Sequence, residues 1–318
     1  MMQPISRKSG LLALGAALGS TVLRPALAQT SGLRVGIIPI SGNAAYYAAE
    51  KLGYFAAENV NVTSQVIRGG AAAIPAMVGG SLDVTYSNGT SIVQAIERGI
   101  DLRLVIEGTI MTNAPPDPGA LLKRKGDPIR TGKDVEGKVV AVNALRDVQW
   151  MFVKAWVTAT GGDPEKVQII EFALPAMVDA IKAKRVDAAL LIDPYMTAAL
   201  DDPSIELLDW PMSKVYPGGP VAFFTITGEV ARRRPNDIRA FVRGYKRGAA
   251  WVNANQGKDA FIDLVAEYTG LSPDLLRRLK PVPVPADIVP GTLPRLTALM
   301  RQTGLLDTNV DLRTKIFS

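Results

Sequence analysis

The chain has 318 residues, of which 47% are hydrophobic and 21% charged, as expected for a globular protein large enough to form two lobes. It contains neither cysteine nor histidine, which excludes disulfides, thiolate nucleophiles, Ser-His-Asp triads and zinc sites built on imidazole or thiolate. Part of the formal net charge of +6 lies in a segment that we expect to be removed. The charge therefore predicts neither nucleic-acid binding nor membrane adhesion.

Residues 1–28 are predicted to be a secretory signal peptide, cleaved after Ala28. Arg7 and Lys8 precede an apolar run of 13 residues, 11–23, and Ala26 and Ala28 then supply the small residues that an export peptidase reads. The run is too short to cross a bilayer, which needs about 20 apolar residues. Cleavage would remove three basic residues and no acidic one, which leaves 290 residues with a net charge of +3. The Sec and twin-arginine export routes both stay open.

The first half of the mature chain alternates short apolar runs with helical patterns. We expect strands at 33–39, 60–63, 83–86 and 102–107, and helices at 44–52, 71–78 and 92–98. The third of these strands is expected to break at 87–89. Strands that alternate with helices predict a parallel α/β sheet. The proline-rich segment 113–118 interrupts the pattern and is predicted to be a linker or hinge.

A second α/β series follows this segment. We expect strands at 138–142, 167–172, 188–192 and 205–208, with helices at 150–159, at 176–184 and after 193–194. The segment 217–220 is a second break. It leads into an apolar run, 221–226, and then into helices at 235–253, 258–268, 273–279 and 293–302. Two breaks around one series predict a discontinuous first lobe, 31–120 with 219–318, and a second lobe, 121–218.

Several segments, in this order, resemble the SsuA/THI5-like (NMT1-type) substrate-binding proteins. They are 35–39 with 48–55, then 69–76, 79–84 with 87–88, 162–167, and 185–189 leading to 193–194. The resemblance covers essentially the whole mature chain. It implies a type II periplasmic binding-protein fold, with two α/β lobes, a central cleft and two crossings, and an ABC importer as partner. Relatives serve sulfonates such as taurine, nitrate or bicarbonate, and thiamine pyrimidine precursors. Three features depart from the family pattern: 143–147 is more charged than usual, Asp193 stands where a glutamate is expected, and Ala173 and Leu174 are unremarkable before a proline–methionine segment, Pro175 and Met177, that resembles the family's.

Three loops are expected at the cleft, because a ligand of an open α/β sheet sits beyond the carboxyl ends of the strands. They are 41–43, 87–91 and 143–147. Unpaired N–H groups and the positive end of a helix dipole suit a carboxylate, sulfonate or nitrate. Ordinary N-capping by the serines and asparagines explains the same residues equally well. The candidate ligand residues are Ser41, Asn43, Tyr47, Ser87, Asn88, Thr90, Asn143, Arg146, Asp193 and Tyr195.

The charged and aromatic candidates each have two interpretations. Arg146 offers a planar fork for an oxyanion, or else pairs with Asp147 or points to solvent. The Asp193 carboxylate could receive an amine, amide or ring N–H from the ligand, or else cap the helix that begins near Pro194. Four rings, those of Tyr46, Tyr47, Trp150 and Tyr195, could wall the cleft or pack in the core.

We therefore expect an extracytoplasmic receptor that carries a small polar or anionic organic molecule to the permease of an ABC importer in the inner membrane. Sulfonates of the taurine type, aminopyrimidines and aromatic acids are the ligand classes considered. A monomeric periplasmic protein is expected, with no catalysis, metal, cofactor or nucleic acid. One alternative is a THI5-like enzyme of pyrimidine synthesis, which the lack of histidine and cysteine disfavours. The other is a sensor that presents its ligand to a membrane receptor.

Overall fold

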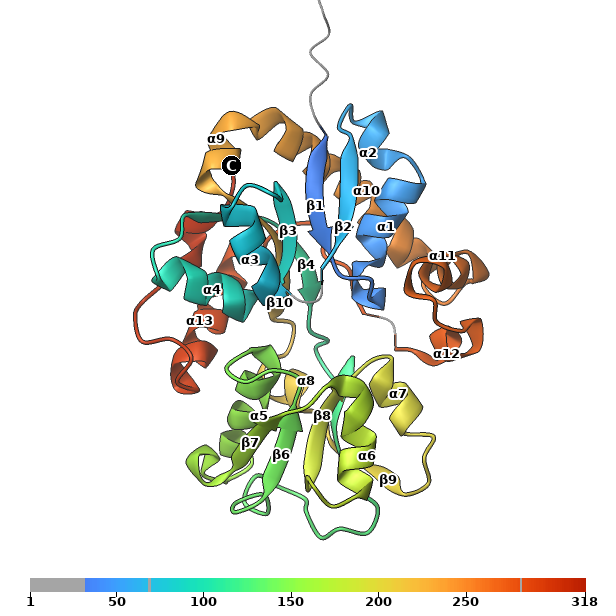
Figure 1. Cartoon of the computed structure of the whole chain (residues 1–318), viewed down its shortest axis with the longest axis vertical. Coiled ribbons are helices and arrows are strands. Elements are labelled where there is room, and N and C mark those ends of the chain that lie inside the picture. Colours follow the sequence, from blue (N-terminus) through green and yellow to red (C-terminus); the bar gives the residue numbers. More distant parts are fainter. Residues whose placement is uncertain (1–31, 68–69, 281) are drawn as a thin grey trace, which may run out of the picture. The chain divides into compact units, whose positions relative to one another are not determined.

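The structure is a computed structural model that describes residues 32–67, 70–280 and 282–318. Residues Gly32–Ser318 form one compact unit built on two five-stranded sheets, one above the other in Figure 1. The expected signal peptide lies outside the described residues. Within the described residues, no helix has the length and apolar character needed to cross a membrane.

The first sheet has the strand order β2-β1-β3-β10-β4. Its strands are β1 (Leu33–Ile37), β2 (Val62–Val66), β3 (Val84–Asn88), β4 (Leu102–Ile110) and β10 (Pro220–Thr227). β1 is parallel to β2 and β3, whereas β10 is antiparallel to both of its neighbours. The four strands expected in the first half of the chain therefore run in the same direction, as predicted, and the sheet is mixed because the chain returns from the second sheet to place β10 between β3 and β4.

The second sheet has the order β7-β6-β8-β5-β9. Its strands are β5 (Gly119–Arg124), β6 (Val139–Val142), β7 (Gln168–Glu171), β8 (Ala188–Ile192) and β9 (Ile205–Asp209). β5 runs antiparallel to β8 and β9, and the sequence analysis missed it. Its apolar run is short and leads directly into Lys123, which reads as the start of a polar loop. In the structure this lysine is buried and paired with Glu206 of β9.

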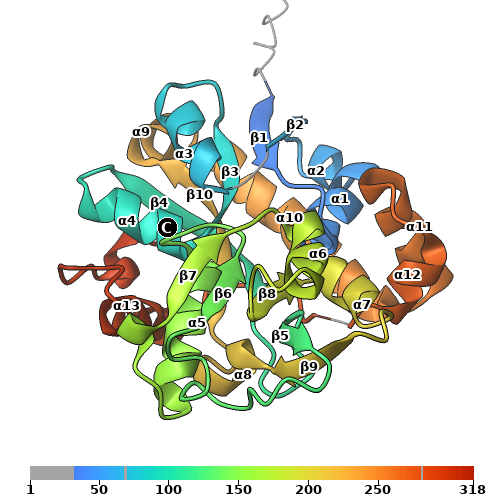
Figure 2. The ribbon, with the colours of Figure 1, turned by 60° about the horizontal axis from the view of Figure 1, so that its bottom comes forward.

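Helices cover both faces of each sheet (Figures 1 and 2). One face of the first sheet packs against α1 (Ala44–Lys51), α2 (Tyr54–Ala57), α10 (Pro235–Asn255) and α11 (Asp259–Thr269). The other packs against α3 (Gly70–Val78), α4 (Gly89–Glu97) and α13 (Leu293–Gln302). In the second sheet, α5 (Val148–Ala159) and α8 (Pro211–Val215) lie opposite α6 (Met177–Lys182) and α7 (Tyr195–Ala199). The remaining helices are α9 (Gly228–Arg233), α12 (Pro273–Arg278) and the short 3-10 turns η1 (Ser41–Asn43), η2 (Pro164–Lys166), η3 (Leu174–Ala176), η4 (Pro290–Thr292) and η5 (Leu312–Lys315).

Two α/β lobes result, and the two segments that join them, 111–118 and 216–219, are hydrogen-bonded to each other. Met111 N–H donates to the Gly219 carbonyl at 2.9 Å, and Gly218 N–H donates to the Thr112 carbonyl at 3.1 Å. Gly218 has φ +62, and a Cβ on Gly219 would lie 2.1 Å from the ring of Tyr216. This close pairing therefore requires glycine at both positions. The crossings lie beside the lobe boundaries expected from the sequence, and those boundaries stay a prediction.

Candidate functional site

The turn after β1 carries the first two candidates, Ser41 and Asn43. Asn43 is buried, and its Nδ2 donates to the Ile38 carbonyl at 2.8 Å. Its Oδ1 has no hydrogen-bond partner among the described residues, and its side chain does not cap α1. Helix capping therefore does not explain Asn43. Ser41 is partly exposed and lines a cavity of the first lobe.

The end of β3 carries Ser87 and Asn88. The expected break at 87–89 is wrong in position, because both residues pair with β10 and extend the strand to Asn88. Ser87 is fully buried, and its hydroxyl finds no partner in the part of the chain that the structure describes. The Oδ1 atom of Asn88 accepts from Ser91 N–H at 2.8 Å, which caps α4. Capping is thus a real role for Asn88, whereas it does not account for the buried Ser87 hydroxyl.

Asp147, at the start of α5 in the second lobe, reaches across to the start of α4 in the first lobe. The Thr90 hydroxyl lies 2.7 Å from Asp147 Oδ1 and 2.6 Å from Asn88 Oδ1, and its single proton serves one of them at a time. Asn88 Nδ2 lies 3.3 Å from Asp147 Oδ2, and Asp147 Oδ1 also accepts from Val148 N–H. We call the contact of Asp147 with Asn88 and Thr90 the Asp147 seam. The negative charge at the start of helix α4 is therefore supplied by the protein itself, through the Asp147 carboxylate.

The rest of the loop 143–147 divides between the interior and the surface. Asn143 N–H donates to Gln149 Oε1 at 2.9 Å. The other amide atoms, Asn143 Oδ1 and Gln149 Nε2, are buried and without a partner among described residues. Arg146 is exposed, and its guanidinium lies 3.4 Å from the Gly304 carbonyl of the first lobe. No ion pair joins it to Asp147 within the described chain, so Arg146 contacts the opposite lobe at the rim.

Asp193 follows β8 directly, at the carboxyl end of the second sheet. Its Oδ1 accepts from the Thr197 N–H at 3.1 Å and from the Thr197 hydroxyl at 2.6 Å, while Oδ2 is buried with no partner among the residues described. Burial raises the pKa of the Asp193 carboxyl, and the hydrogen bonds from Thr197 and the nearby Lys280 of the first lobe oppose that rise. Thr197 thus fixes one oxygen of the carboxylate, and the backbone of Lys280 approaches the group from the first lobe.

A second polar contact between the lobes lies close to Asp193. The Arg278 guanidinium of α12 binds Asp201 through one nitrogen, at 2.7 and 2.8 Å from the two carboxylate oxygens. The same nitrogen lies 3.3 Å from the Thr197 carbonyl. We call this contact the Arg278 seam. The Asp147 seam and the Arg278 seam thus join the second lobe to the first at two places, the loop before α5 and the residues just after α7.

The four aromatic candidates take different places. Tyr46 is fully buried in the core of the first lobe. Tyr47 stacks on Tyr268 with ring centroids 3.8 Å apart, and Trp150 packs against the edge of a hydrophobic cluster. Tyr195 is 39% exposed. The core interpretation holds for Tyr46, and a place at the cleft stays a prediction for the other three.

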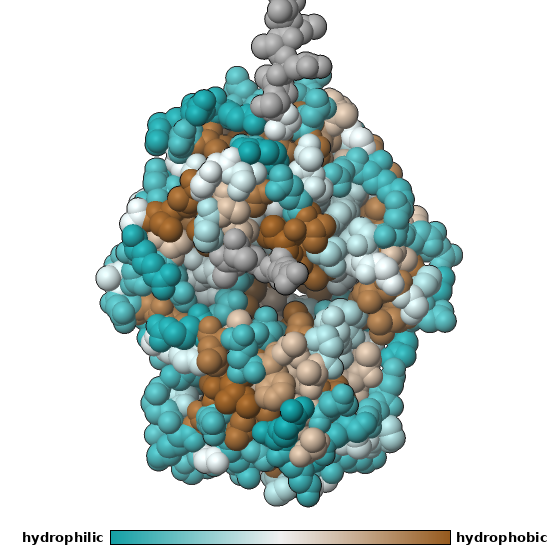
Figure 3. Space-filling model, in the orientation of Figure 1, coloured by the Kyte–Doolittle hydropathy of each residue, from teal (hydrophilic) through white to brown (hydrophobic). Residues whose placement is uncertain are grey.

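Four strands that face the junction of the lobes therefore end in a buried polar atom without a partner among described residues: Asn43 Oδ1 after β1, Ser87 Oγ in β3, Asn143 Oδ1 after β6 and Asp193 Oδ2 after β8. Such an atom costs about 1–3 kcal/mol when nothing pairs with it, and native proteins contain few of them. Figure 3 shows the surface hollowed where the lobes meet. These four atoms are the candidates for contact with a ligand between the lobes.

Gln149 is the site residue that sequence reasoning missed. It lies in the first turn of α5, is 2% exposed and shares the unpartnered set with Asn143. A glutamine in the first turn of a helix is ordinarily solvated, so the sequence carried no signal for it. Nothing in the described chain groups three or more acidic side chains in a way that could hold a metal ion.

Solved structures with the same architecture come from several bacteria. The periplasmic aliphatic sulphonate binding protein SsuA from Escherichia coli is 20% identical, with a TM-score of 0.74 over 90% of this chain and 97% of that chain. The alkanesulfonate-binding protein SsuA from Xanthomonas axonopodis pv. citri, bound to MOPS, is 17% identical, with a TM-score of 0.71 over 90% and 97%. The periplasmic nitrate-binding protein NrtA from Synechocystis PCC 6803 is 12% identical, with a TM-score of 0.71 over 90% and 85%. At these identities the likeness confirms the two-lobed periplasmic binding-protein fold.

The sequence itself supplies the family. A comparison with curated protein sequences gives no match. The family profile described as NMT1/THI5 like matches residues 41–258, which is more than half of the chain and includes nine of the ten strands. The resemblance found in the sequence is thereby confirmed, and the chain belongs to the NMT1/THI5-like family.

Proposed function

We propose that the protein is an extracytoplasmic solute receptor, which holds a small polar organic molecule between its lobes and presents it to an ABC importer. The observation that carries this proposal is the set of unpartnered polar atoms at the strand ends of both lobes. The structural relatives that bind sulfonates and nitrate are consistent with it. A receptor of this kind closes on its ligand by hinge motion and releases it unchanged.

The chemistry of the unpartnered atoms favours a ligand with both donors and acceptors. Asn43 Oδ1, Asn143 Oδ1 and Asp193 Oδ2 accept hydrogen bonds, Gln149 Nε2 donates them, and the Ser87 hydroxyl does either. A bare anion such as nitrate would leave the three acceptors unpaired and place a negative charge near Asp193. We therefore favour a taurine-like zwitterion or an aminopyrimidine, with an aromatic acid as the third class.

The proposed ligand residues remain those of the sequence analysis, with Gln149 added. Delivery through a permease in the inner membrane, a periplasmic location and a monomeric state belong to the same proposal. So does the absence of catalysis. Each follows from the receptor function that we propose for this member of the family.

The test begins with the purified protein as isolated. Small molecules released by denaturation are identified by mass spectrometry, and sulfonates, aminopyrimidines and aromatic acids are then screened for a rise in Tm. We expect one class to raise Tm and to be recovered intact after incubation. Recovery of a chemically altered molecule would favour the enzyme alternative. No shift with any of the three classes would refute the proposed ligand chemistry.

A further inference from the structure

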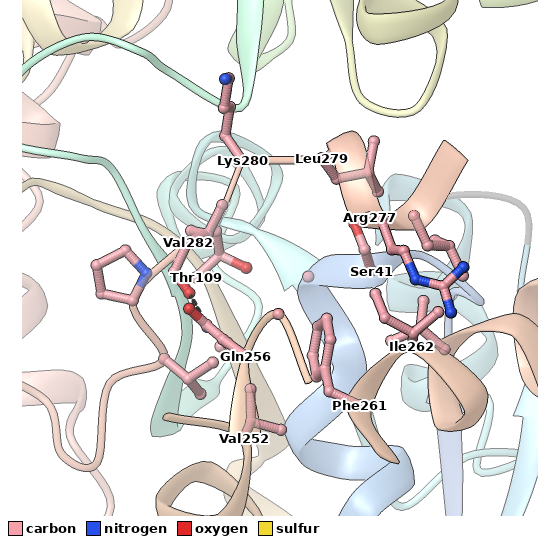
Figure 4. A pocket seen from close by; sticks show the side chains of 17 residues that line it. Ser41, Thr109, Val252, Gln256, Phe261, Ile262, Arg277, Leu279, Lys280 and Val282 are labelled. Atoms are coloured by element: carbon pink, nitrogen blue, oxygen red, sulfur yellow. Dashed lines mark hydrogen bonds between the residues drawn. The ribbon is translucent and has the colours of Figure 1, made fainter. Parts of the chain in front are cut away.

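The first lobe contains a cavity of about 180 Å³ that none of the contacts described so far explains (Figure 4). Its walls come from α10, α11 and α12, and one side is formed by Ser41 and Gly42 in the turn after β1. This is the same turn that carries the unpartnered Asn43 Oδ1. The cavity therefore adjoins the place where we propose that the ligand binds.

Most of the side chains that line the cavity are apolar, and the polar ones are those of Ser41, Thr109, Gln256, Arg277 and Lys280. Val252, Ile262, Val265 and Leu276 line it and are at most 3% exposed, and the ring of Phe261 joins them. An engineered cavity of about 150 Å³ with an entirely apolar lining stays dry and binds benzene. The space here is larger, so it can hold a phenyl ring or an alkyl group of about six carbons.

The wall opposite α11 is fixed by hydrogen bonds that need no ligand. Gln256 Nε2 donates to the Val282 carbonyl at 2.7 Å. Asn253 Nδ2 donates to the Val284 carbonyl at 3.0 Å, and Val284 N–H donates back to Asn253 Oδ1 at 3.2 Å. Two side chains at the end of α10 thus hold residues 282–284 in place, and the cavity is formed before anything enters it.

One end of the cavity is polar and faces the second lobe. Lys280 contributes to the lining, and Figure 4 shows its amino group at the opposite end of the view from Val252, beyond the apolar side chains. The backbone of the same lysine approaches Asp193 of the second lobe. A molecule with a polar head near Lys280 and Asp193 could therefore extend an apolar group between α10 and α11.

We propose that this cavity is a subsite for an apolar substituent, so that the ligand is an amphipathic molecule carrying a phenyl ring or an alkyl chain of about six carbons. This inference rests on the proposed receptor function, because it assigns the polar head to the site between the lobes. It selects the longer members of the ligand classes over the short ones.

The experiment uses three probes: taurine as a head alone, N-hexyltaurine as a head with a tail, and benzene as a tail alone. Each buried methylene adds about fourfold to affinity, so N-hexyltaurine should bind at least about thirtyfold more tightly than taurine by calorimetry. The variant Val252→Phe fills the cavity and should abolish this gain while leaving taurine binding unaffected. Val242→Phe places the same change on the same helix, outside the cavity, and should keep the gain.

Equal affinity for the two sulfonates in the natural protein would overturn the inference, and so would a gain that persists in Val252→Phe. If circular dichroism shows that Val252→Phe does not fold, Val265→Phe serves as the second filling variant. If neither sulfonate binds, a taurine-like head group is excluded and benzene decides on the cavity. A rise in Tm with benzene that the filling variant loses would support the subsite, and no rise would overturn it.

Discussion

We expect the hydrogen bonds of the Asp147 seam to stabilise a closed arrangement of the lobes in the ligand-free protein. Thr90→Val removes the hydroxyl that lies 2.7 Å from Asp147 Oδ1 and keeps the shape of the side chain. A hydrogen bond to a charged acceptor contributes about 1.5–3 kcal/mol. The lower end applies because the Thr90 proton is shared with Asn88 Oδ1 at 2.6 Å. The bond from Val148 N–H to Asp147 lies within one lobe and does not change on opening. The equilibrium should therefore shift toward the open form by roughly tenfold.

Single-molecule energy transfer between the lobes measures this shift. The chain has no cysteine, so Lys166→Cys in the second lobe and Glu229→Cys in the first give two unique labelling sites on exposed positions. Thr90→Ser keeps the hydroxyl and should reproduce the distance distribution of the natural protein. If Thr90→Val also reproduces it, the seam contributes no free energy to closure and our reasoning is refuted.

Three further predictions concern the ligand, the core and pH. Asp193→Ala and Asn88→Ala should each weaken ligand binding at least about tenfold, or 1.4 kcal/mol, by calorimetry, and unchanged affinity in both would show that the pocket is misplaced. Asp209→Ala removes the acceptor that lies 2.7 Å from the buried Trp156 indole nitrogen and should lower the free energy of unfolding by about 1–3 kcal/mol in urea; a loss of under about 0.5 kcal/mol would contradict this. Burial raises the pKa of Glu107 from 4.5 to about 7, so the folded state keeps a proton that the unfolded chain releases in that range. Stability relative to Glu107→Gln should therefore fall by on the order of 3 kcal/mol as pH rises from 4.5 through 7, and an offset that does not vary between pH 5 and pH 8 would be the contrary result.

The local pattern of the sequence was sufficient for most of the elements. The strand at 188–192 and the helix at 293–302 were predicted with the bounds that the structure has. Both are marked by changes in hydrophobic periodicity, which is a local signal. Strand β5 was not predicted because Lys123 looks like a loop residue in the sequence. It can lie in a buried strand only because it pairs with Glu206, which is 83 residues away. The direction of β10 likewise depends on where the chain returns after the second lobe.

The candidate site shows the same division. Loops 41–43, 87–91 and 143–147 could be predicted because strand ends and helix starts are visible as polar residues between apolar runs. Whether a side chain in such a loop caps its own helix, contacts the other lobe or stays unpaired could not be predicted. Asn88 caps α4 and also contacts Asp147 of the other lobe, whereas the Ser87 hydroxyl has no partner among the described residues. In the sequence, the buried Gln149 could not be distinguished from any other residue in the first turn of a helix.

From its sequence alone this protein could be recognised as an α/β chain of the NMT1/THI5-like family with polar turns at the ends of its strands, because composition, periodicity and turn residues are read over short stretches. Only the tertiary structure decided which of those polar atoms remain without a partner and which meet across the lobes. The Asp147 seam joins residues 59 positions apart, and the Arg278 seam joins residues 77 positions apart. Contacts over such separations are set by how whole elements pack, which no short stretch of sequence encodes.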